Sequence, residues 1–419
     1  MVSDLPEAAR PPRARQRRRK ALTHVGGRVE VHTRDPELAR VLVTALDVRP
    51  DEERVLAHVH GFHSYPARMH PDTAGALARA LSPERGTVLD PFCGSGTVLV
   101  AARELGRVAL GSDLNPLAVR LARLKLSSVD EGFVRALNAA AERVAEHALA
   151  RKAAELGPTH PYGPEDRELF APHVLLELDG LRDGIDQIAE REIASALRLV
   201  LSALLTKVSV RRGDSSAGVT PKRIAGGFTI RFFVKKTREL GERLLEAERR
   251  RPKRAPVARV EIADARRLGF VRDRSVDLVL SSPPYPGVYD YFEHHRLRLR
   301  WLRLDGRELR RSEIGARRTA RSAAEAIAAW ERDFGRCLAE MARVLRPNGH
   351  VALLLADSTV GGRALRVERW LPEFAARADL DVVGRAAQPR PHFHAPSSRA
   401  FATRPRFEHL VILKPGRSK

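Results

Sequence analysis

Residues 87–97 read Thr-Val-Leu-Asp-Pro-Phe-Cys-Gly-Ser-Gly-Thr, and this stretch decides the fold. Its apolar start is typical of a buried strand, and the residues from Thr97 to Leu105 have the spacing of a helix that ends at Gly106. A loop with two glycines therefore joins a strand to a helix. Because glycine has no side chain, Gly94 and Gly96 allow positive φ and let the backbone approach a ligand closely.

A second strand follows at once, over Val108–Asp113, and completes a βαβ unit. Such a unit implies a parallel sheet. Asp113 ends this strand about 20 residues after the loop, where a carboxylate can accept hydrogen bonds from the ribose hydroxyls of a nucleotide-like ligand. We therefore expect a ligand crevice at the carboxyl ends of these two strands.

The rest of the chain divides by its hydrophobic pattern. Long amphipathic stretches interrupt the alternation of strands and helices between residues 127 and 256. Buried strands are predicted after that block, over Val257–Ile262, Val276–Leu280, Val351–Leu355 and His409–Leu413. We predict a disordered basic arm (1–20), the first part of an α/β domain (21–126), a mainly helical insertion (127–256) and the second part of the domain (257–419).

A second motif, Ser282-Pro283-Pro284-Tyr285, follows the predicted strand Val276–Leu280 and should lie at the same edge of the sheet. An exocyclic amine on an aromatic heterocycle is a poor nucleophile because its lone pair is delocalised into the ring. The Ser282 hydroxyl and the Pro283 carbonyl can accept hydrogen bonds from such an amine and localise that lone pair. Tyr285 is a candidate to stack on a base taken out of its helix. The alternative is an ordinary Pro-Pro turn.

Composition favours a polyanionic partner. The chain has 74 Lys and Arg against 52 Asp and Glu, a formal net charge of +22, although a GC-rich genome would also favour arginine. Cys93 and Cys337 are too few for a disulfide framework or a zinc site, and His392 and His394 have no matching ligand cluster, so we predict no metal. The sequence shows neither a long apolar run nor a secretory signal, so we expect a cytoplasmic protein without membrane contact.

Residues 90–97 resemble motif I of the DNA amino-methyltransferases, the adenine-N6 and cytosine-N4 enzymes, and Ser282–Tyr285 resembles their motif IV. Residues 62–71, Phe-His-Ser-Tyr-Pro-Ala-Arg-Met-His-Pro, resemble motif X, which in the family helps to hold the cofactor carboxylate. The resemblance implies S-adenosylmethionine as cofactor and an α/β class I (Rossmann-like) methyltransferase fold, with a mostly parallel seven-stranded sheet and here a helical insertion. Residues 345–350 resemble the turn before strand five of that fold.

The resemblance also assigns roles. Asp90 and the backbone of residues 94–97 would hold the methionine end of the cofactor, Asp113 its ribose and Asp264 its adenine amino group. The alternative for Asp264 is a helix N-cap, and for motif X a proline-rich lead-in to a helix. The predicted cofactor-binding residues are His63, Tyr65, Arg68, Asp90, Pro91, Phe92, Cys93, Gly94, Ser95, Gly96, Thr97, Asp113 and Asp264. The predicted catalytic residues are Ser282, Pro283, Pro284 and Tyr285.

The resemblance implies methylation of a DNA base flipped into the site. Serine at the first position of motif IV is typical of cytosine-N4 enzymes, so we predict N4 of cytosine as the target. The alternatives are adenine N6 in DNA, a base amine in RNA or tRNA, and a non-catalytic nucleic-acid-binding protein on the same fold. Residues 211–236 of the insertion are expected to contact nucleic acid, and Arg296, Arg298 and Arg300 either meet phosphates or form a solvated helix face.

Overall fold

The structure is a computed structural model that describes residues 27–48, 55–66, 68–211, 222–256, 258–287, 289–316, 322–390 and 399–416. The predicted arm over residues 1–20 and the pair His392 and His394 lie outside the described residues. No helix within these ranges has the length and apolar character needed to cross a bilayer.

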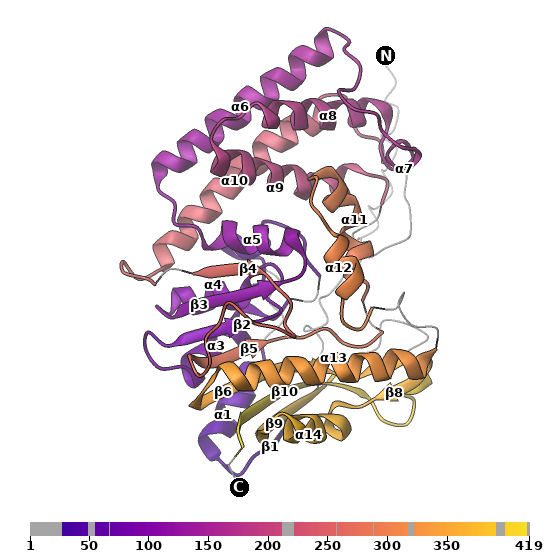
Figure 1. Cartoon of the computed structure of the whole chain (residues 1–419). Helices are drawn as coiled ribbons and strands as arrows, with labels where there is room; N and C mark the ends of the chain where they lie inside the picture. Colours follow the sequence, from indigo (N-terminus) through magenta and orange to yellow (C-terminus); the bar gives the residue numbers. More distant parts are fainter. Residues whose placement is uncertain are drawn as a thin grey trace, which may run out of the picture.

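An eight-stranded sheet forms the centre of the α/β part, with the strand order β1-β9-β10-β6-β5-β2-β3-β4 (Figure 1). Its strands are β1 (Glu30–His32), β2 (Thr87–Asp90), β3 (Val108–Asp113), β4 (Arg259–Ile262), β5 (Val276–Ser281), β6 (Leu345–Ala356), β9 (Leu380–Arg390) and β10 (Arg406–Pro415). The five neighbouring strands β6, β5, β2, β3 and β4 pair in parallel. Strand β10 pairs antiparallel with both β6 and β9. A hairpin of β7 (Ser358–Val360) and β8 (Arg363–Leu365) stands apart.

The Rossmann-like α/β fold is confirmed, but the predicted number of seven strands is wrong by one. The eighth strand, β1, pairs antiparallel with β9, with Glu30 opposite Ala387. It is only three residues long and lies at the edge of the sheet. A strand this short has too few residues to show an alternating apolar pattern, so it could not be recognised from the sequence.

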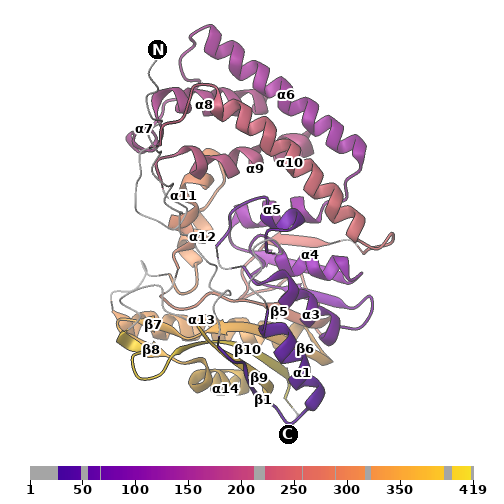
Figure 2. The ribbon, with the colours of Figure 1, turned by 180° about the vertical axis from the view of Figure 1, so that it is seen from behind.

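Helices cover both faces of the sheet. One face carries α1 (Pro36–Leu46), α3 (Pro71–Leu81), α4 (Thr97–Glu104) and α5 (Pro116–Leu126), and the other carries α13 (Ala323–Val344) and α14 (Val367–Arg377). The first group is nearer the viewer in Figure 2 and the second in Figure 1. Each face has its own cluster of buried apolar side chains, so the sheet lies between two cores.

The segment between α5 and β4 is helical and lies beyond α5, at the top of Figures 1 and 2. Its helices are α6 (Glu131–Ala153), α7 (Pro164–Leu169), α8 (Pro172–Asp186), α9 (Arg191–Val208) and α10 (Phe228–Arg250). Their apolar side chains join the same cluster as α1, α3, α4 and α5. The helical segment therefore packs on the α/β part through a continuous core.

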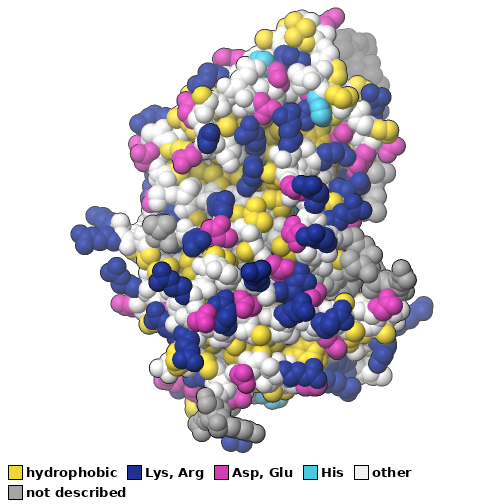
Figure 3. Space-filling view, in the orientation of Figure 1, with side chains coloured by type: hydrophobic (Ala, Val, Ile, Leu, Met, Phe, Trp, Pro, Cys, Tyr) yellow, Lys and Arg dark blue, Asp and Glu magenta, His cyan; other side chains and the backbone are white. Residues whose placement is uncertain are grey.

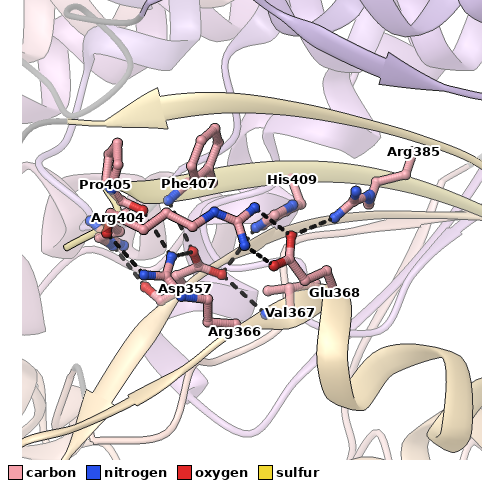
Figure 4. A network of polar contacts seen from close by, with 10 residues as sticks. Asp357, Arg366, Val367, Glu368, Arg385, Arg404, Pro405, Phe407 and His409 are labelled. Carbon is pink, nitrogen blue, oxygen red and sulfur yellow. Dashed lines mark hydrogen bonds and ion pairs between the residues drawn. The ribbon is translucent and has the colours of Figure 1, made fainter. Parts of the chain in front are cut away.

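Asp357, directly after β6, fixes the chain where it leaves the carboxyl edge of the sheet (Figure 4). The carboxylate is buried, and it accepts hydrogen bonds from the backbone N–H of Val367 at 3.0 Å and of Phe407 at 3.1 Å. His409 Nε2 lies 3.0 Å and Arg366 Nη1 3.2 Å from it. Burial by itself would raise the pKa of Asp357, but the contact with His409 and these amides lower it. The carboxylate thus ties α14 and β10 to the end of β6.

The turn predicted over residues 345–350 lies inside β6, which begins at Leu345. Val276 of β5 is opposite Leu345, and Leu278 is opposite His350, so three extra residues of β6 bulge out of the pairing. The exposed side chains of the bulge are Arg346, Pro347 and Asn348. The prediction of a turn before the strand is therefore corrected to a bulge at its start.

Candidate active site

Two adjoining cavities lie where β2, β3 and β5 end. The first is lined by Tyr65, Pro91, Phe92, Gly94, Asp113, Leu114, Ala263, Asp264, Ala265, Ser282, Pro284, Tyr291, Leu309, Glu313 and Ile314. The second is lined by Tyr65, Arg68, Met69, Asp90, Phe92, Cys93, Gly94, Ser95, Thr97, Val98 and Ser282. Both cavities share Tyr65, Phe92, Gly94 and Ser282. Residues from the three sequence motifs therefore meet in one place.

The two loop glycines have the positive φ that the sequence predicts, +48° at Gly94 and +86° at Gly96. A Cβ on Gly94 would lie 3.1 Å from Cε1 of Tyr65, and a Cβ on Gly96 would lie 3.0 Å from Cβ of Ala122. Gly94 thus lets the aromatic ring close over the loop, and Gly96 lets α4 begin tightly against α5. A larger residue at either position would combine backbone strain with a steric conflict.

Asp90 ends β2 and lines the second cavity, with its side chain buried. Its Oδ1 accepts hydrogen bonds from the Ser281 hydroxyl at 2.6 Å and from the backbone N–H of Phe92 at 3.1 Å. Burial raises the pKa of Asp90 to about 7, against these two hydrogen bonds, which lower it. Ser281 ends β5 and was not predicted as a site residue, although it precedes Ser282.

Asp113 lines the first cavity from the end of β3. Its two carboxylate oxygens accept hydrogen bonds from the backbone N–H of Gly94 at 2.9 Å and of Asn115 at 2.8 Å. Burial raises the pKa of Asp113 to about 6, while the two amides lower it. The carboxylate therefore also holds the glycine loop in place.

Asp264 lines the first cavity just after β4. Its Oδ1 accepts from the backbone N–H of Arg266 at 2.9 Å, and its Oδ2 lies 2.6 Å from Arg266 Nη2. The chain from residue 265 forms turns and not a helix, so the N-cap alternative is wrong. The turn directs the carboxylate to the cavity wall.

In motif IV, Ser282 lines both cavities and Pro284 lines the first. The Ser282 hydroxyl lies 3.4 Å from the Tyr285 hydroxyl, which donates to the carbonyl of Leu354 in β6 at 3.1 Å. The Tyr285 ring packs against the core on the α13 face and is absent from the described lining of both cavities. In this structure Tyr285 therefore holds Ser282 rather than presenting its ring to the cavities.

Motif X is divided between the site and the helical segment. Tyr65 and Arg68 line the second cavity, and Arg68 donates a hydrogen bond to the carbonyl of His60. His63 is buried elsewhere, with its Nε2 3.0 Å from the Ser202 hydroxyl in α9, and does not appear in the described lining. His63 thus joins motif X to the insertion, a contact that the motif alone could not indicate.

The segment after motif IV covers the first cavity, and of its lining residues the sequence did not single out Leu309, Glu313 and Ile314. Tyr291 begins α11 (Tyr291–Trp301), and Leu309 lies in α12 (Arg307–Ser312). Glu313 accepts hydrogen bonds from the backbone N–H of Tyr291 at 2.5 Å and of Phe292 at 3.3 Å, so it caps α11. No motif marks these residues, and only the path of the chain brings them over the site.

The arginines of α11 are engaged within the protein. Arg298 is 1% exposed, and its guanidinium donates to the hydroxyls of Ser64 at 3.0 Å and Thr206 at 3.2 Å. Arg296 and Arg300 form ion pairs with Glu165, at 3.0 Å and 2.6 Å. Neither predicted alternative fits Arg298, because this side chain meets neither phosphate nor solvent.

The chemistry of the two cavities fits the two ends of S-adenosylmethionine. The first offers the ring of Phe92 and the carboxylates of Asp113 and Asp264, which suit an adenosine with its amino group and ribose hydroxyls. The second offers the cationic Arg68 and the carboxyl of Asp90, which suit a carboxylate and an ammonium. Burial raises the pKa of the Cys93 thiol, so a thiolate nucleophile is disfavoured at this position.

Part of the chain is similar to known methyltransferases. A family profile described as DNA methylase, of the N6 and N4 type, matches residues 20–124. The type II methyltransferase M.MjaII of Methanocaldococcus jannaschii is 34% identical over 86 residues, which cover 20% of this chain and 16% of that protein. M.MvaI of Kocuria varians is 36% identical over 74 residues, which cover 17% of this chain and 16% of that protein. M.BsoBI of Geobacillus stearothermophilus is 24% identical over 298 residues, 61% of this chain and 55% of that protein.

The matches thus span less than two thirds of each of these relatives. Among solved structures, a TehB-like S-adenosylmethionine-dependent methyltransferase of Corynebacterium glutamicum aligns over 82% of this chain and 86% of its own, at 11% identity and a TM-score of 0.31. That likeness is too low to support an argument, and the fold rests on the strand order given above. The DNA methylase match supports S-adenosylmethionine as the cofactor of the site. Over residues 20–124 the chain is similar to the DNA methylases of the N6 and N4 type.

Proposed function

We propose that the chain is an S-adenosylmethionine-dependent DNA methyltransferase that methylates the exocyclic N4 amine of cytosine. The observation that carries the proposal is the place of Ser282, which lines both cavities. If the first cavity binds the adenosine of the cofactor and the second binds its amino-acid end, the sulfonium that joins these two parts lies near Ser282. The donor, when bound, supplies an electrophilic methyl group at that junction.

The protein's part in the reaction is to make the amine of the base more nucleophilic by accepting its hydrogen bonds. The Tyr285 hydroxyl donates its proton to the Leu354 carbonyl. In the 3.4 Å contact between the two hydroxyls, Tyr285 is therefore the acceptor and Ser282 the donor. The Ser282 oxygen keeps a lone pair for an amine hydrogen, and the Pro283 carbonyl is a second acceptor. Two acceptors on one amine draw it toward tetrahedral geometry and make its lone pair available to the methyl group. Pro284 is held by the indole N–H of Trp330, which donates to its carbonyl at 3.2 Å.

Cytosine N4 follows from the resemblance at Ser282, since serine at this position is typical of cytosine-N4 enzymes. The DNA methylase match and the type II relatives support DNA as the substrate. Incubation of the protein with methyl-labelled S-adenosylmethionine and either double-stranded DNA or total RNA separates these substrates. We expect label in DNA and none in RNA. Label in RNA alone would replace the proposal by the RNA alternative, and binding of nucleic acid without any transfer would favour the non-catalytic one.

The surface charge does not by itself mark the path of the DNA. Figure 3 shows Lys and Arg spread over the visible face and mixed with acidic side chains. Within the insertion residues predicted to contact nucleic acid, 212–221 lie outside the described part. In the described part, Arg231 and Lys235 of α10 are exposed and four residues apart, so they lie on the same face of the helix.

We predict that the double substitution Arg231→Ala and Lys235→Ala weakens DNA binding. Each lost phosphate contact should lower the slope of log K against log salt by about 1, so the pair should lower it by about 2. Fluorescence anisotropy with a labelled duplex at several salt concentrations measures this slope. The matched control is Arg369→Ala with Lys414→Ala, two exposed cations on the α/β part. If both double variants keep the wild-type slope, this face of the insertion does not contact DNA.

A further inference from the structure

A buried lysine of α5 contacts the glycine loop on the side of the loop that faces α5. Lys125 lies in the last turn of α5, and its side chain is 1% exposed. Its Nζ lies 3.1 Å from the hydroxyl of Ser95, which is itself 1% exposed and lines the second cavity. Lys125 was not recognised in the sequence because it belongs to no motif, although its spacing from Leu121 and Ala122 places it on the buried face of α5.

The last carbonyls of α5 accept hydrogen bonds from other side chains than Lys125. Arg251 donates to the carbonyl of Lys125 at 2.6 Å and to that of Ser127 at 2.7 Å. Arg103 donates to the carbonyl of Leu126. Two arginines therefore already satisfy the last carbonyls of the helix, where basic side chains are otherwise favoured. The direction of the Lys125 side chain needs another explanation.

The charge near the second cavity is unbalanced. Among the residues that the structure describes, no carboxylate forms an ion pair with Lys125 or with Arg68. Burial, and then the nearby Arg68, lower the pKa of Lys125 well below its ordinary value. Lys125 is buried and Arg68 is half-buried, and the lining of the second cavity contains one carboxyl, that of Asp90. Removing cations from water without enough opposite charge is unfavourable, so the site favours a further anionic group.

The hydroxyl of Ser95 can carry the charge of Lys125 into the cavity. An anion in the cavity favours the protonated form of Lys125, which only donates hydrogen bonds. The Ser95 oxygen then accepts from Lys125, and its own proton is left to donate. Within the described ranges, Ser95 makes no hydrogen bond other than the one with Lys125. A hydroxyl polarised in this way is a good donor to a carboxylate.

We infer that Lys125 and Ser95 form, together with Arg68, the binding site for the carboxylate of the cofactor's amino-acid end. Ser95 makes the contact, and Lys125 is a positioning residue that acts through it. The inference rests on the proposed function, because it takes S-adenosylmethionine as the ligand. The carboxylate site thus contains, besides Arg68 of motif X, the pair formed by Ser95 and Lys125.

The test compares two ligands that differ in this carboxylate alone, S-adenosylmethionine and decarboxylated S-adenosylmethionine. Their dissociation constants are measured by isothermal titration calorimetry for the full-length wild type, Lys125→Met, Ser95→Ala, the double variant and Lys125→Arg. Lys207→Met is the matched control, because Lys207 is an exposed lysine on α9.

We expect Lys125→Met and Ser95→Ala each to weaken binding of S-adenosylmethionine by about tenfold or more, the loss typical of a hydrogen bond to a charged group. The decarboxylated ligand should change by less than about twofold on the same scale, the double variant should be no weaker than either single one, and Lys125→Arg should recover part of the loss. Equal losses for both ligands, as a merely structural role would give, or no loss for S-adenosylmethionine, would overturn the inference.

If Lys125→Met does not fold, Ser95→Ala with the same two ligands decides the question. A wild type that binds neither ligand would instead refute the proposed function itself.

Discussion

Replacing Ser282 by alanine is expected to lower kcat by about 10²- to 10³-fold, the loss seen when one preorganised hydrogen-bonding group is removed from an active site. The dissociation constant for S-adenosylmethionine should change little, because the hydroxyl acts on the amine of the base and not on the donor. In the structure Ser282 lines both cavities, and Tyr285 holds its hydroxyl at 3.4 Å.

The measurement is single-turnover methyl transfer to a DNA duplex, with cofactor affinity determined in parallel. Ser275→Ala is the matched control, since Ser275 lies in an exposed turn and donates to the Arg272 carbonyl at 2.7 Å. A Ser282→Ala protein with the kcat of the wild type would remove the serine from the mechanism.

Asp90→Asn should make the protein more stable and at the same time poorer at binding its cofactor. Both hydrogen bonds to Asp90, from Ser281 and Phe92, reach the same oxygen, so the amide oxygen of asparagine can keep them. The substitution removes a buried charge whose desolvation raises the pKa of Asp90 from 3.8 to about 7. A shift of this size corresponds to about 4 kcal/mol of unfolding free energy.

The sign of the pH dependence follows from the raised pKa. Above pH 7 the carboxyl is ionised in the folded and the unfolded protein, so the penalty of its burial is complete. Between pH 7 and about 4 the folded protein takes up the proton first, and the penalty declines. The stability gain of Asp90→Asn should therefore be largest near pH 8 and vanish near pH 4.

Urea unfolding at several pH values measures this gain, and calorimetry at pH 8 measures the cofactor affinity, which we expect to fall by about tenfold to 100-fold. Asp381→Asn serves as the control, because Asp381 is an exposed carboxylate at the far end of β9. A variant that is less stable than the wild type at pH 8, or that binds the cofactor equally well, would contradict the role given to Asp90.

The sequence could predict that the site residues lie close together, because this depends only on the direction of the strands that precede them. Asp90, Asp113 and Ser281 end three neighbouring parallel strands, and the carboxyl ends of parallel strands meet at one edge of the sheet. The glycine loop also follows from local chemistry, since positive φ at Gly94 and Gly96 is a property of the residues themselves.

The rest depends on how distant segments pack, which no local pattern records. Motif X suggested His63 as a cofactor ligand, but α9 brings Ser202 to this side chain and turns it away from the cavities. Arg298 has the sequence context of an exposed helix face, yet its side chain is buried and contacts both motif X and α9. Leu309 and Glu313 reach the site only because the chain after motif IV folds back over the first cavity.

The central claim is tested most directly by the identity of the methylated base. DNA methylated by the purified protein with deuteromethyl-labelled S-adenosylmethionine is digested to nucleosides and analysed by mass spectrometry against synthetic standards. The proposal predicts labelled N4-methylcytosine, formed about 10²- to 10³-fold more slowly by Ser282→Ala. Labelled N6-methyladenine would contradict the choice of base, and label on a ring carbon of cytosine would contradict methyl transfer to an amine.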